Sequence, residues 1–218
     1  MNSQIAIHLS NRGVEELSRG DHNAAFHSLS KAVNIVMMKI HNHVHVNDGS
    51  GMFVFSWENC ASGITTTKEG AVQFLSLRAL RISTTATEES EVERLCPCGY
   101  AWAIWFNLAL CCSVIGTKMG EKGAPFLEMA YDLYDKIQHR VENEPSKYNR
   151  HWTMISMIVS NNQACIFYDL CMHDAAMQCL NKLATALASC EDNMGVEDRG
   201  EFCLNLQILG GHTVAAAA

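Results

Sequence analysis

Two pairs of small residues recur in this sequence at one fixed spacing. Gly13 is followed twelve residues later by Ala25, and Ala164 is followed twelve residues later by Ala176. Around both pairs, apolar residues recur with helical periodicity. Internal similarity of this kind indicates a chain built from repeated supersecondary units. The sequence therefore predicts a mainly α-helical protein in which helix pairs recur along the chain.

A third, weaker copy begins at Asn107-Leu-Ala109, and it makes the repeat irregular. Gly13 and Ala109 are 96 residues apart, whereas Ala109 and Ala164 are 55 residues apart. Regular arrays of helix pairs step by about 34 residues. We therefore expect a short, interrupted array rather than a uniform solenoid.

The helical pattern falls into two blocks. Residues 5–40 predict two helices around a turn at Gly20-Asp21, where Gly ends the first helix and Asp caps the second. Residues 100–190 predict four helices of about 16–22 residues. Their breaks are expected near 116–123, 142–149 and 171–174, and a short element at 201–209 follows.

Residues 41–98 differ from both blocks and predict a β-hairpin insert. Phe53, Phe55 and Trp57 alternate with other residues within a strand-like run at 52–57, and a second run covers 73–82. We expect a single domain over residues 1–218, with this insert and a loosely held Ala-rich tail at 210–218.

The repeated segments resemble tetratricopeptide repeats. In that pattern a small residue two positions after an Asn, and an Ala twelve residues further on, let two antiparallel helices approach closely. The Gly between the helices is matched by Gly20 and Gly116 but is Cys171 in the third copy. The Ala that packs on the next repeat is matched by Ala32 but is Leu183 in the third copy.

The chain also looks like the small tetratricopeptide-like proteins expanded in diatoms. The likeness rests on Phe106-Asn-Leu-Ala-Leu110, on Phe202-Cys-Leu-Asn-Leu206 and on the terminal Ala residues. The resemblance implies antiparallel helix pairs stacked as an irregular right-handed superhelix. It implies almost nothing about biochemistry.

The resemblance also implies a candidate binding surface. Asn11, Asn107 and Asn162 share the repeat position that lines the concave face of such domains. An amide offers both a donor and an acceptor, so it can bind the backbone of an extended peptide without reading its sequence. The alternative is that these Asn residues bond between helices and stabilise the stack. The neighbouring candidate contacts are Ser10, Val14, Leu110, Cys165, Tyr168 and Asp169.

Two clusters suggest a metal- or redox-responsive protein as an alternative. His41, His43 and His45 would share one face of a strand, and Cys96 and Cys98 flank a proline. A solvated turn is the alternative explanation for the three His residues. Neither Cys96/Cys98 nor Cys111/Cys112 has the spacing of a zinc ribbon. We expect no bound metal and no cofactor. Cys165, Cys179 and one of the adjacent Cys111 and Cys112 are expected in the core.

Composition and missing motifs narrow the function classes. The sequence contains no nucleophile elbow, metalloprotease motif, phosphate loop or dinucleotide fingerprint, so we expect no enzyme activity. A net charge of −7 argues against nucleic acid and polybasic membrane binding. Only 18% of residues are charged, which favours a contact surface and makes a homo-oligomer an open possibility.

No signal peptide or long apolar run is recognised, so the expected location is the cytoplasm. The expected function is a noncatalytic protein–protein interaction module that binds a protein or peptide segment in a concave helical groove.

Overall fold

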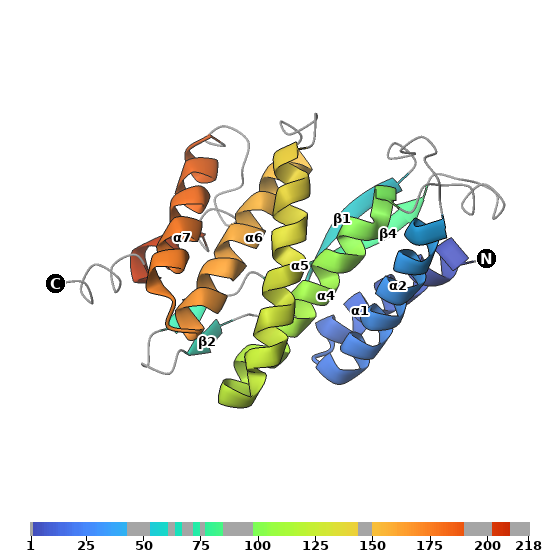
Figure 1. Ribbon diagram of the computed structural model, residues 1–218, viewed down its shortest axis with the longest axis horizontal. Coiled ribbons are helices and arrows are strands. Elements are labelled where there is room, and N and C mark those ends of the chain that lie inside the picture. The colour runs from blue at the N-terminus through green and yellow to red at the C-terminus, as the bar shows by residue number, and fades with distance from the viewer. Residues whose placement is uncertain are drawn as a thin grey trace. The chain divides into compact units, whose positions relative to one another are not determined.

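The computed structural model in Figure 1 describes most of the chain in two compact units. The described residues are 2–42, 53–60, 64–66, 72–74, 77–84, 98–143, 150–189 and 202–209. The N-terminal unit comprises Met1–Ala61 and Leu77–Ile115, and the C-terminal unit comprises Ser62–Ser76 and Gly116–Ala218. Each unit is considered by itself below.

The predicted mainly helical fold with a small hairpin is confirmed. The helices are α1 (Asn2–Ser18), α2 (His22–Asn42), α4 (Cys98–Met119), α5 (Ala124–Asn143), α6 (Arg150–Asp169) and α7 (His173–Ala188), with a short 3-10 helix η2 (Gly120–Gly123) and a last helix at 202–209. The helices α4 to α7 contain 22, 20, 20 and 16 residues, as their periodicity predicts. The right-handed superhelix stays a prediction.

The turn between α1 and α2 forms as the sequence predicts. Gly20 has a φ of +79°, a conformation that suits glycine, and its N–H donates to the Leu17 carbonyl at 2.9 Å. The Asp21 carboxylate accepts a hydrogen bond from the Ala24 N–H at 3.1 Å and so caps α2. A Cβ atom added at Gly13 would lie 2.5 Å from the Leu29 Cγ, so the close approach of α1 and α2 requires glycine there.

The turn between α6 and α7 has the same backbone geometry without a glycine. Cys171 takes a φ of 58°, and its N–H donates to the Tyr168 carbonyl at 3.0 Å. The Met172 N–H donates to the Phe167 carbonyl at 2.8 Å. This pair of bonds, three and five residues back along the chain, also closes α1. Cys171 therefore stands in the structural place of Gly20.

The predicted role of Gly116 as the glycine between two helices is wrong. Gly116 lies inside α4, where an added Cβ would lie 2.6 Å from the Leu127 Cδ2. The left-handed position after α4 belongs to Gly120, with a φ of +57°. Gly116 is thus a close-contact glycine like Gly13, and the helix continues past it to Met119.

The insert contains two nested antiparallel strand pairs. Strand β1 (Phe53–Asn59) pairs with β4 (Arg78–Thr84), and β2 (Ile64–Thr66) pairs with β3 (Val72–Phe74). The predicted single strand at 73–82 is therefore two strands, β3 and β4. The expected bounds of the insert, 41–98, are wrong at both ends, because residues 41–42 belong to α2 and Cys98 begins α4. Residues 43–52, 61–63, 67–71, 75–76 and 85–97, and the tail at 210–218, lie outside the described residues.

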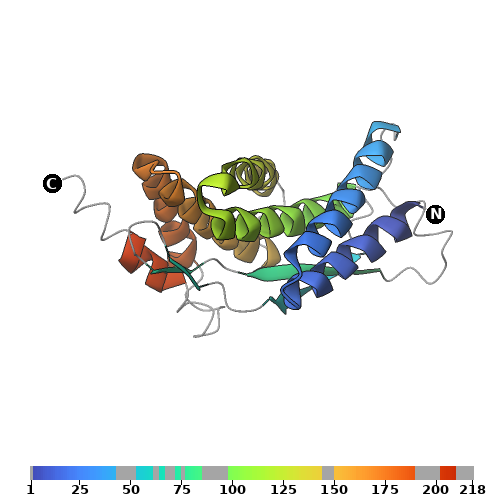
Figure 2. The same cartoon turned by 90° about the horizontal axis from the view of Figure 1, so that it is seen from below.

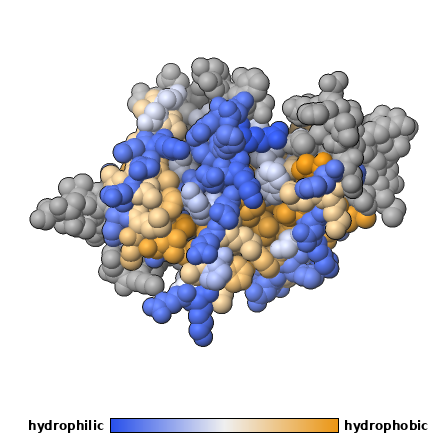
Figure 3. Space-filling view, in the orientation of Figure 1, coloured by the Kyte–Doolittle hydropathy of each residue, from blue (hydrophilic) through white to orange (hydrophobic). Residues whose placement is uncertain are grey.

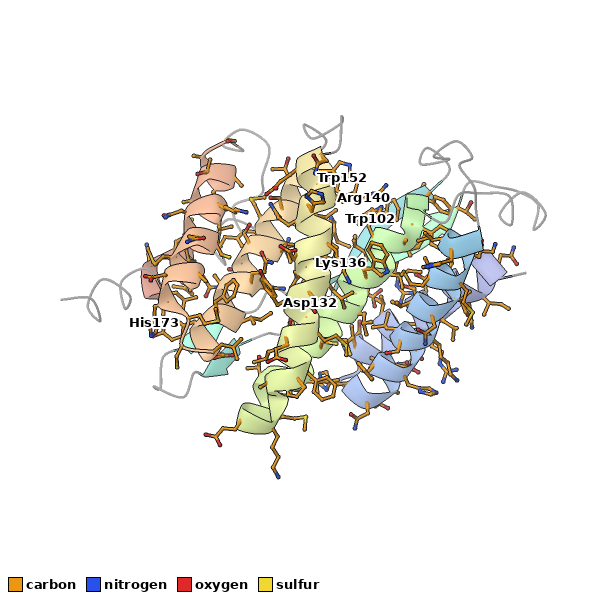
Figure 4. All side chains as sticks on the ribbon, in the orientation of Figure 1. Trp102, Asp132, Lys136, Arg140, Trp152 and His173 are labelled. Carbon is orange, nitrogen blue, oxygen red and sulfur yellow. The ribbon has the colours of Figure 1, made fainter. Side chains whose placement is uncertain are left out.

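Strand β1 packs through its alternating aromatic residues onto α4. The ring centroids of Phe53 and Tyr100 are 5.0 Å apart, those of Phe55 and Trp102 are 4.6 Å apart, and those of Trp57 and Phe106 are 5.9 Å apart. The predicted half-buried strand is confirmed. Figure 2 shows the β1–β4 ribbon running beneath α4 and crossing α1 in this view. Trp102, labelled in Figure 4, is buried in this core.

Helix α5 shows the amphipathic pattern of a helix on the surface of the C-terminal unit. Leu133 and Ile137 are buried, whereas Asp132 and Lys136 are exposed and stand along the outer face in Figure 4. The hydropathy view in Figure 3 shows the same helix as a hydrophilic stripe. Apolar residues on one side and charged residues on the other fix which face of α5 turns inward.

One helical run, Gly99–Asn143, is long and apolar enough to cross a membrane by length and composition. Its most apolar stretch is almost entirely buried inside the structure, as in the core helices of soluble proteins. The run therefore indicates neither a membrane nor a compartment.

Candidate functional site

Asn11 of α1 binds the backbone of β4 through two hydrogen bonds. Its Nδ2 donates to the Ile82 carbonyl at 2.8 Å, and its Oδ1 accepts from the Ile82 N–H at 2.9 Å. One amide therefore satisfies both backbone groups of one strand residue. This is the donor-and-acceptor chemistry that the amide predicts, made here to the chain's own extended segment.

Asn107 of α4 binds the same strand in the same way, two residues earlier. Its Nδ2 donates to the Leu80 carbonyl and its Oδ1 accepts from the Leu80 N–H, both at 2.8 Å. The amide is fully buried, so these bonds replace water entirely. Ser10 Oγ accepts a further bond from Asn107 Nδ2 at 3.3 Å and links α1 to this contact.

The two amides lie on the edge of β4 that faces away from β1. The Cys60 N–H donates to the Leu77 carbonyl at 2.8 Å, which marks these facing residues as a hydrogen-bonded pair. Because pairs alternate along an antiparallel ladder, Ala79 and Arg81 direct their backbone groups toward β1. Leu80 and Ile82 direct theirs toward Asn107 and Asn11. Strand β4 is thus bound along both edges.

We call this arrangement the strand slot: β1 on one side, and Asn11 and Asn107 on the other. Buried backbone groups are costly unless they are paired, and an unpaired strand edge invites other strands. The two amides act here in the place of a third strand. Because they contact only backbone atoms, they require an extended segment and no particular side chain.

An ion-pair network fixes the side chain at the centre of β4. The Arg81 guanidinium contacts the Glu58 carboxylate of β1 and, at 3.1 Å, the Glu15 carboxylate of α1. Ser18 donates to the other Glu58 oxygen at 3.0 Å. The hydrogen bond from Arg81 lowers the pKa of Glu58 despite its partial burial, and the bond to Glu58 raises the pKa of Arg81.

The apolar side chains that flank Arg81 are fully enclosed. Leu80 and Ile82 are 0% and 1% exposed. Val14 and Leu110, two predicted contacts on α1 and α4, are also fully buried. Five predicted contact residues therefore belong to the N-terminal unit, where Asn11 is half-buried and the other four are buried, namely Ser10, Val14, Asn107 and Leu110.

Asn162 follows the alternative that sequence reasoning left open. It is fully buried in the C-terminal unit, where its Nδ2 donates to the Tyr134 hydroxyl at 3.0 Å and its Oδ1 accepts from Asn161 at 3.1 Å. Asn205 of the last helix donates to the Asn161 Oδ1 at 2.6 Å. Within the described residues these amides connect α5, α6 and the last helix, as structural bonds between helices do.

The other predicted contacts of the C-terminal unit lie near the end of α6. Tyr168 is buried and its ring meets that of His173 edge-on, with centroids 5.4 Å apart. Asp169 is half-buried at the last residue of α6. Cys165, fully buried, accepts a hydrogen bond from Asn205 at 3.8 Å.

Five described cysteines are buried, and burial disfavours the thiolate form of each. Burial raises the pKa of Cys112 to about 12 and that of Cys179 to about 11, and it also raises the pKa values of Cys60, Cys111 and Cys165. Core positions for Cys165 and Cys179 are confirmed. The expectation that only one of Cys111 and Cys112 faces the core is wrong, because both are fully buried.

The described residues contain no group of three side chains that suits a metal ion. His41 lies on the last turn of α2, whereas His43, His45 and Cys96 lie outside the described residues. The backbone of Cys98 begins α4.

The strand-like run at 73–82 is predicted from the sequence, but its place in the slot is not. Asn11 and Asn107 are predicted as contacts for a partner's peptide, whereas their ligands in the structure are the backbone groups of Leu80 and Ile82. The alternation of apolar residues with Arg81 was the available signal, since it marks a strand with one enclosed face.

The chain was compared with known protein families, curated proteins and solved structures, and none of them matches it.

Proposed function

We propose that this protein is a noncatalytic interaction module that binds an extended segment of a protein partner through the amides of Asn11 and Asn107. The observation that carries the proposal is the pair of two-bond contacts to the backbone of β4. A pair of amides that satisfies both backbone groups at alternate residues of a strand is suited to strand addition, a common mode of peptide recognition.

The tetratricopeptide-like resemblance supports the same proposal, because it attributes peptide contact to the repeat position of these two Asn residues. The remaining features of the described chain fit a binding role. Its buried thiols have raised pKa values, and its hydrogen-bonded polar side chains serve structural contacts. We propose a cytoplasmic protein whose partner is another protein rather than nucleic acid.

A capture experiment tests this function. Proteins bound to the wild-type chain in native extract are compared with those bound to the double variant Asn11→Ala/Asn107→Ala and to Asn34→Ala, which removes an exposed amide of α2. We expect specific partners to be retained by Asn34→Ala and lost from the double variant, at a temperature where melting curves show all three folded. Partners that bind the double variant unchanged would contradict the proposal.

A further inference from the structure

The strand slot already contains one ligand, the chain's own β4, and this ligand shows what the slot recognises. Backbone groups of β4 are bound on one edge by β1 and on the other by Asn11 and Asn107. The Leu80 and Ile82 side chains are enclosed, and Arg81 between them meets Glu15 and Glu58. The slot thus selects an extended segment with the pattern apolar–basic–apolar.

The groups that bind β4 are supplied by other elements. Asn11 and Glu15 belong to α1, Asn107 belongs to α4, and Glu58 belongs to β1. Strand β1 is held separately, because its three aromatic residues pack on α4. If β4 alone withdrew, the slot would keep its two amides, its two carboxylates and the β1 edge.

We infer that β4 is a built-in occupant of the strand slot, and that a partner segment of the pattern apolar–Arg–apolar binds by displacing it and pairing antiparallel to β1. This inference rests on the proposed function and names its ligand class and its control. Such a segment regains the backbone bonds, the enclosed apolar contacts and the Arg pairing that β4 loses. The cost of association and the exposure of the withdrawn β4 oppose the exchange, so β4 restricts binding at the slot. A peptide that adds a strand to a sheet edge is bound in the same way, through main-chain hydrogen bonds and pockets for alternate side chains.

Competition between the two strands has a measurable consequence. A ligand whose site is open only part of the time binds with an affinity reduced by the open fraction. Weakening β4 within the chain must therefore tighten the binding of a free peptide. Two independent sites would show no such coupling.

The test uses a fluorescein-labelled peptide of residues 77–84, Leu-Arg-Ala-Leu-Arg-Ile-Ser-Thr, titrated into the full chain and followed by anisotropy. Arg81→Ala in the chain weakens β4 but leaves Glu15, Glu58, Asn11 and Asn107 in place. We expect it to bind the peptide roughly fivefold more tightly than wild type, since partly exposed ion pairs contribute at most about that factor. Arg81→Lys is a milder change, and its affinity for the peptide is expected to lie between those of wild type and Arg81→Ala.

Two controls identify the contacts. The double variant Asn11→Ala/Asn107→Ala is expected to lose binding, because the outer edge of the bound strand then has no partner. A peptide with Glu in place of Arg81 is expected to bind Arg81→Ala more weakly, because it would face Glu15 and Glu58. Circular dichroism confirms that each variant is folded before it is titrated.

The failures are distinguishable. Equal peptide affinity for wild type, Arg81→Lys and Arg81→Ala would overturn displacement while leaving the binding function standing. No binding to any folded variant would overturn the ligand class, and the capture experiment then decides the function separately. Dimers of Arg81→Ala by light scattering, without peptide binding, would assign the slot to a second copy of this chain and overturn a separate partner.

Discussion

At the scale of single residues, one side-chain amide makes the backbone hydrogen bonds that a neighbouring strand would make. Asn107 satisfies both backbone groups of Leu80 in a site that excludes water. An unpaired buried donor or acceptor costs about 1–3 kcal/mol, which makes the exchange of this amide for any apolar side chain expensive. Ser10 adds a third bond and fixes the amide orientation that suits the strand.

Cys171 offers a residue-scale prediction about stability. Its φ of 58° disfavours a side chain, and the matching position in the first turn is Gly20. We expect Cys171→Gly to raise the free energy of unfolding by about 0.5–1 kcal/mol, after the greater entropy of unfolded glycine is subtracted. Denaturant unfolding measures the change, with Gly20→Ala as the reverse control, expected to destabilise by about 1 kcal/mol. A destabilised Cys171→Gly would contradict the assignment of the turn.

Thiol accessibility gives a second residue-scale prediction. Cys171 and Cys203 are exposed, whereas Cys60, Cys111, Cys112, Cys165 and Cys179 are buried. In folded protein, iodoacetamide should therefore modify the two exposed thiols and spare the five buried ones, which mass spectrometry of tryptic peptides resolves. Denaturant should abolish the difference. Rapid modification of Cys111 or Cys112 in folded protein would contradict the buried pair.

At the scale of elements, the β1–β4 hairpin is joined to α1 by a network that responds to pH. The Arg81 hydrogen bond lowers the pKa of Glu58 from its ordinary value of 4.5. A lowered pKa in the folded state adds stability above the unfolded pKa, and this stability is lost as the pH falls through the folded pKa. The network therefore stabilises the hairpin at neutral pH and not in acid.

A comparison of two chains isolates that contribution. Arg81→Ala should unfold at lower denaturant concentration than wild type at neutral pH, and the gap should narrow as the pH falls below about 4. Carboxylates other than Glu58 and Glu15, the two that contact Arg81, contribute alike to both chains and cancel in the difference. A gap that stays constant down to strongly acidic pH would show that Glu58 is not the partner.

The contact between α1 and α2 carries a second element-scale prediction. A Cβ at Gly13 would lie 2.5 Å from Leu29 Cγ, closer than real Cβ contacts. We expect Gly13→Ala to destabilise the N-terminal unit by about 1–3 kcal/mol through overpacking. Leu29 is fully buried, so Leu29→Ala is itself destabilising, and Gly13→Ala/Leu29→Ala should cost less than the sum of the two single changes. Thermal melting of the single and double variants measures both effects. A neutral Gly13→Ala would contradict the close approach.

The helices and strand β1 are predicted from the sequence more reliably than the candidate site. Periodicity gave the helices, and the alternation of Phe53, Phe55 and Trp57 gave β1, because each pattern arises from the face an element buries. The predicted turn position of Gly116 is wrong, because the sequence does not distinguish a glycine at a close helix contact from a glycine in a turn. The pairing of Asn107 with Leu80 could not be read, because it depends on how the insert folds back over the helices.

At the scale of the whole molecule, the repeat position of the Asn residues serves different ends in the two units. In the N-terminal unit, Asn11 and Asn107 bind a strand, whereas Asn162 in the C-terminal unit joins a network of helix-to-helix bonds. The same amide chemistry is thus used for strand binding in one unit and for internal structure in the other. The interaction function we propose belongs to the N-terminal unit.

Residue-resolved hydrogen exchange by NMR tests the binding of β4 by Asn11 and Asn107 most directly. Asn107→Ala should accelerate exchange at the Leu80 amide by on the order of tenfold or more, with a smaller effect at Ile82, because the lost acceptor is worth more than 1 kcal/mol. Asn11→Ala should reverse that order, and Asn34→Ala should change neither. Amides of α6 and α7 should keep their protection throughout. Unchanged exchange at Leu80 in Asn107→Ala would contradict the strand slot itself.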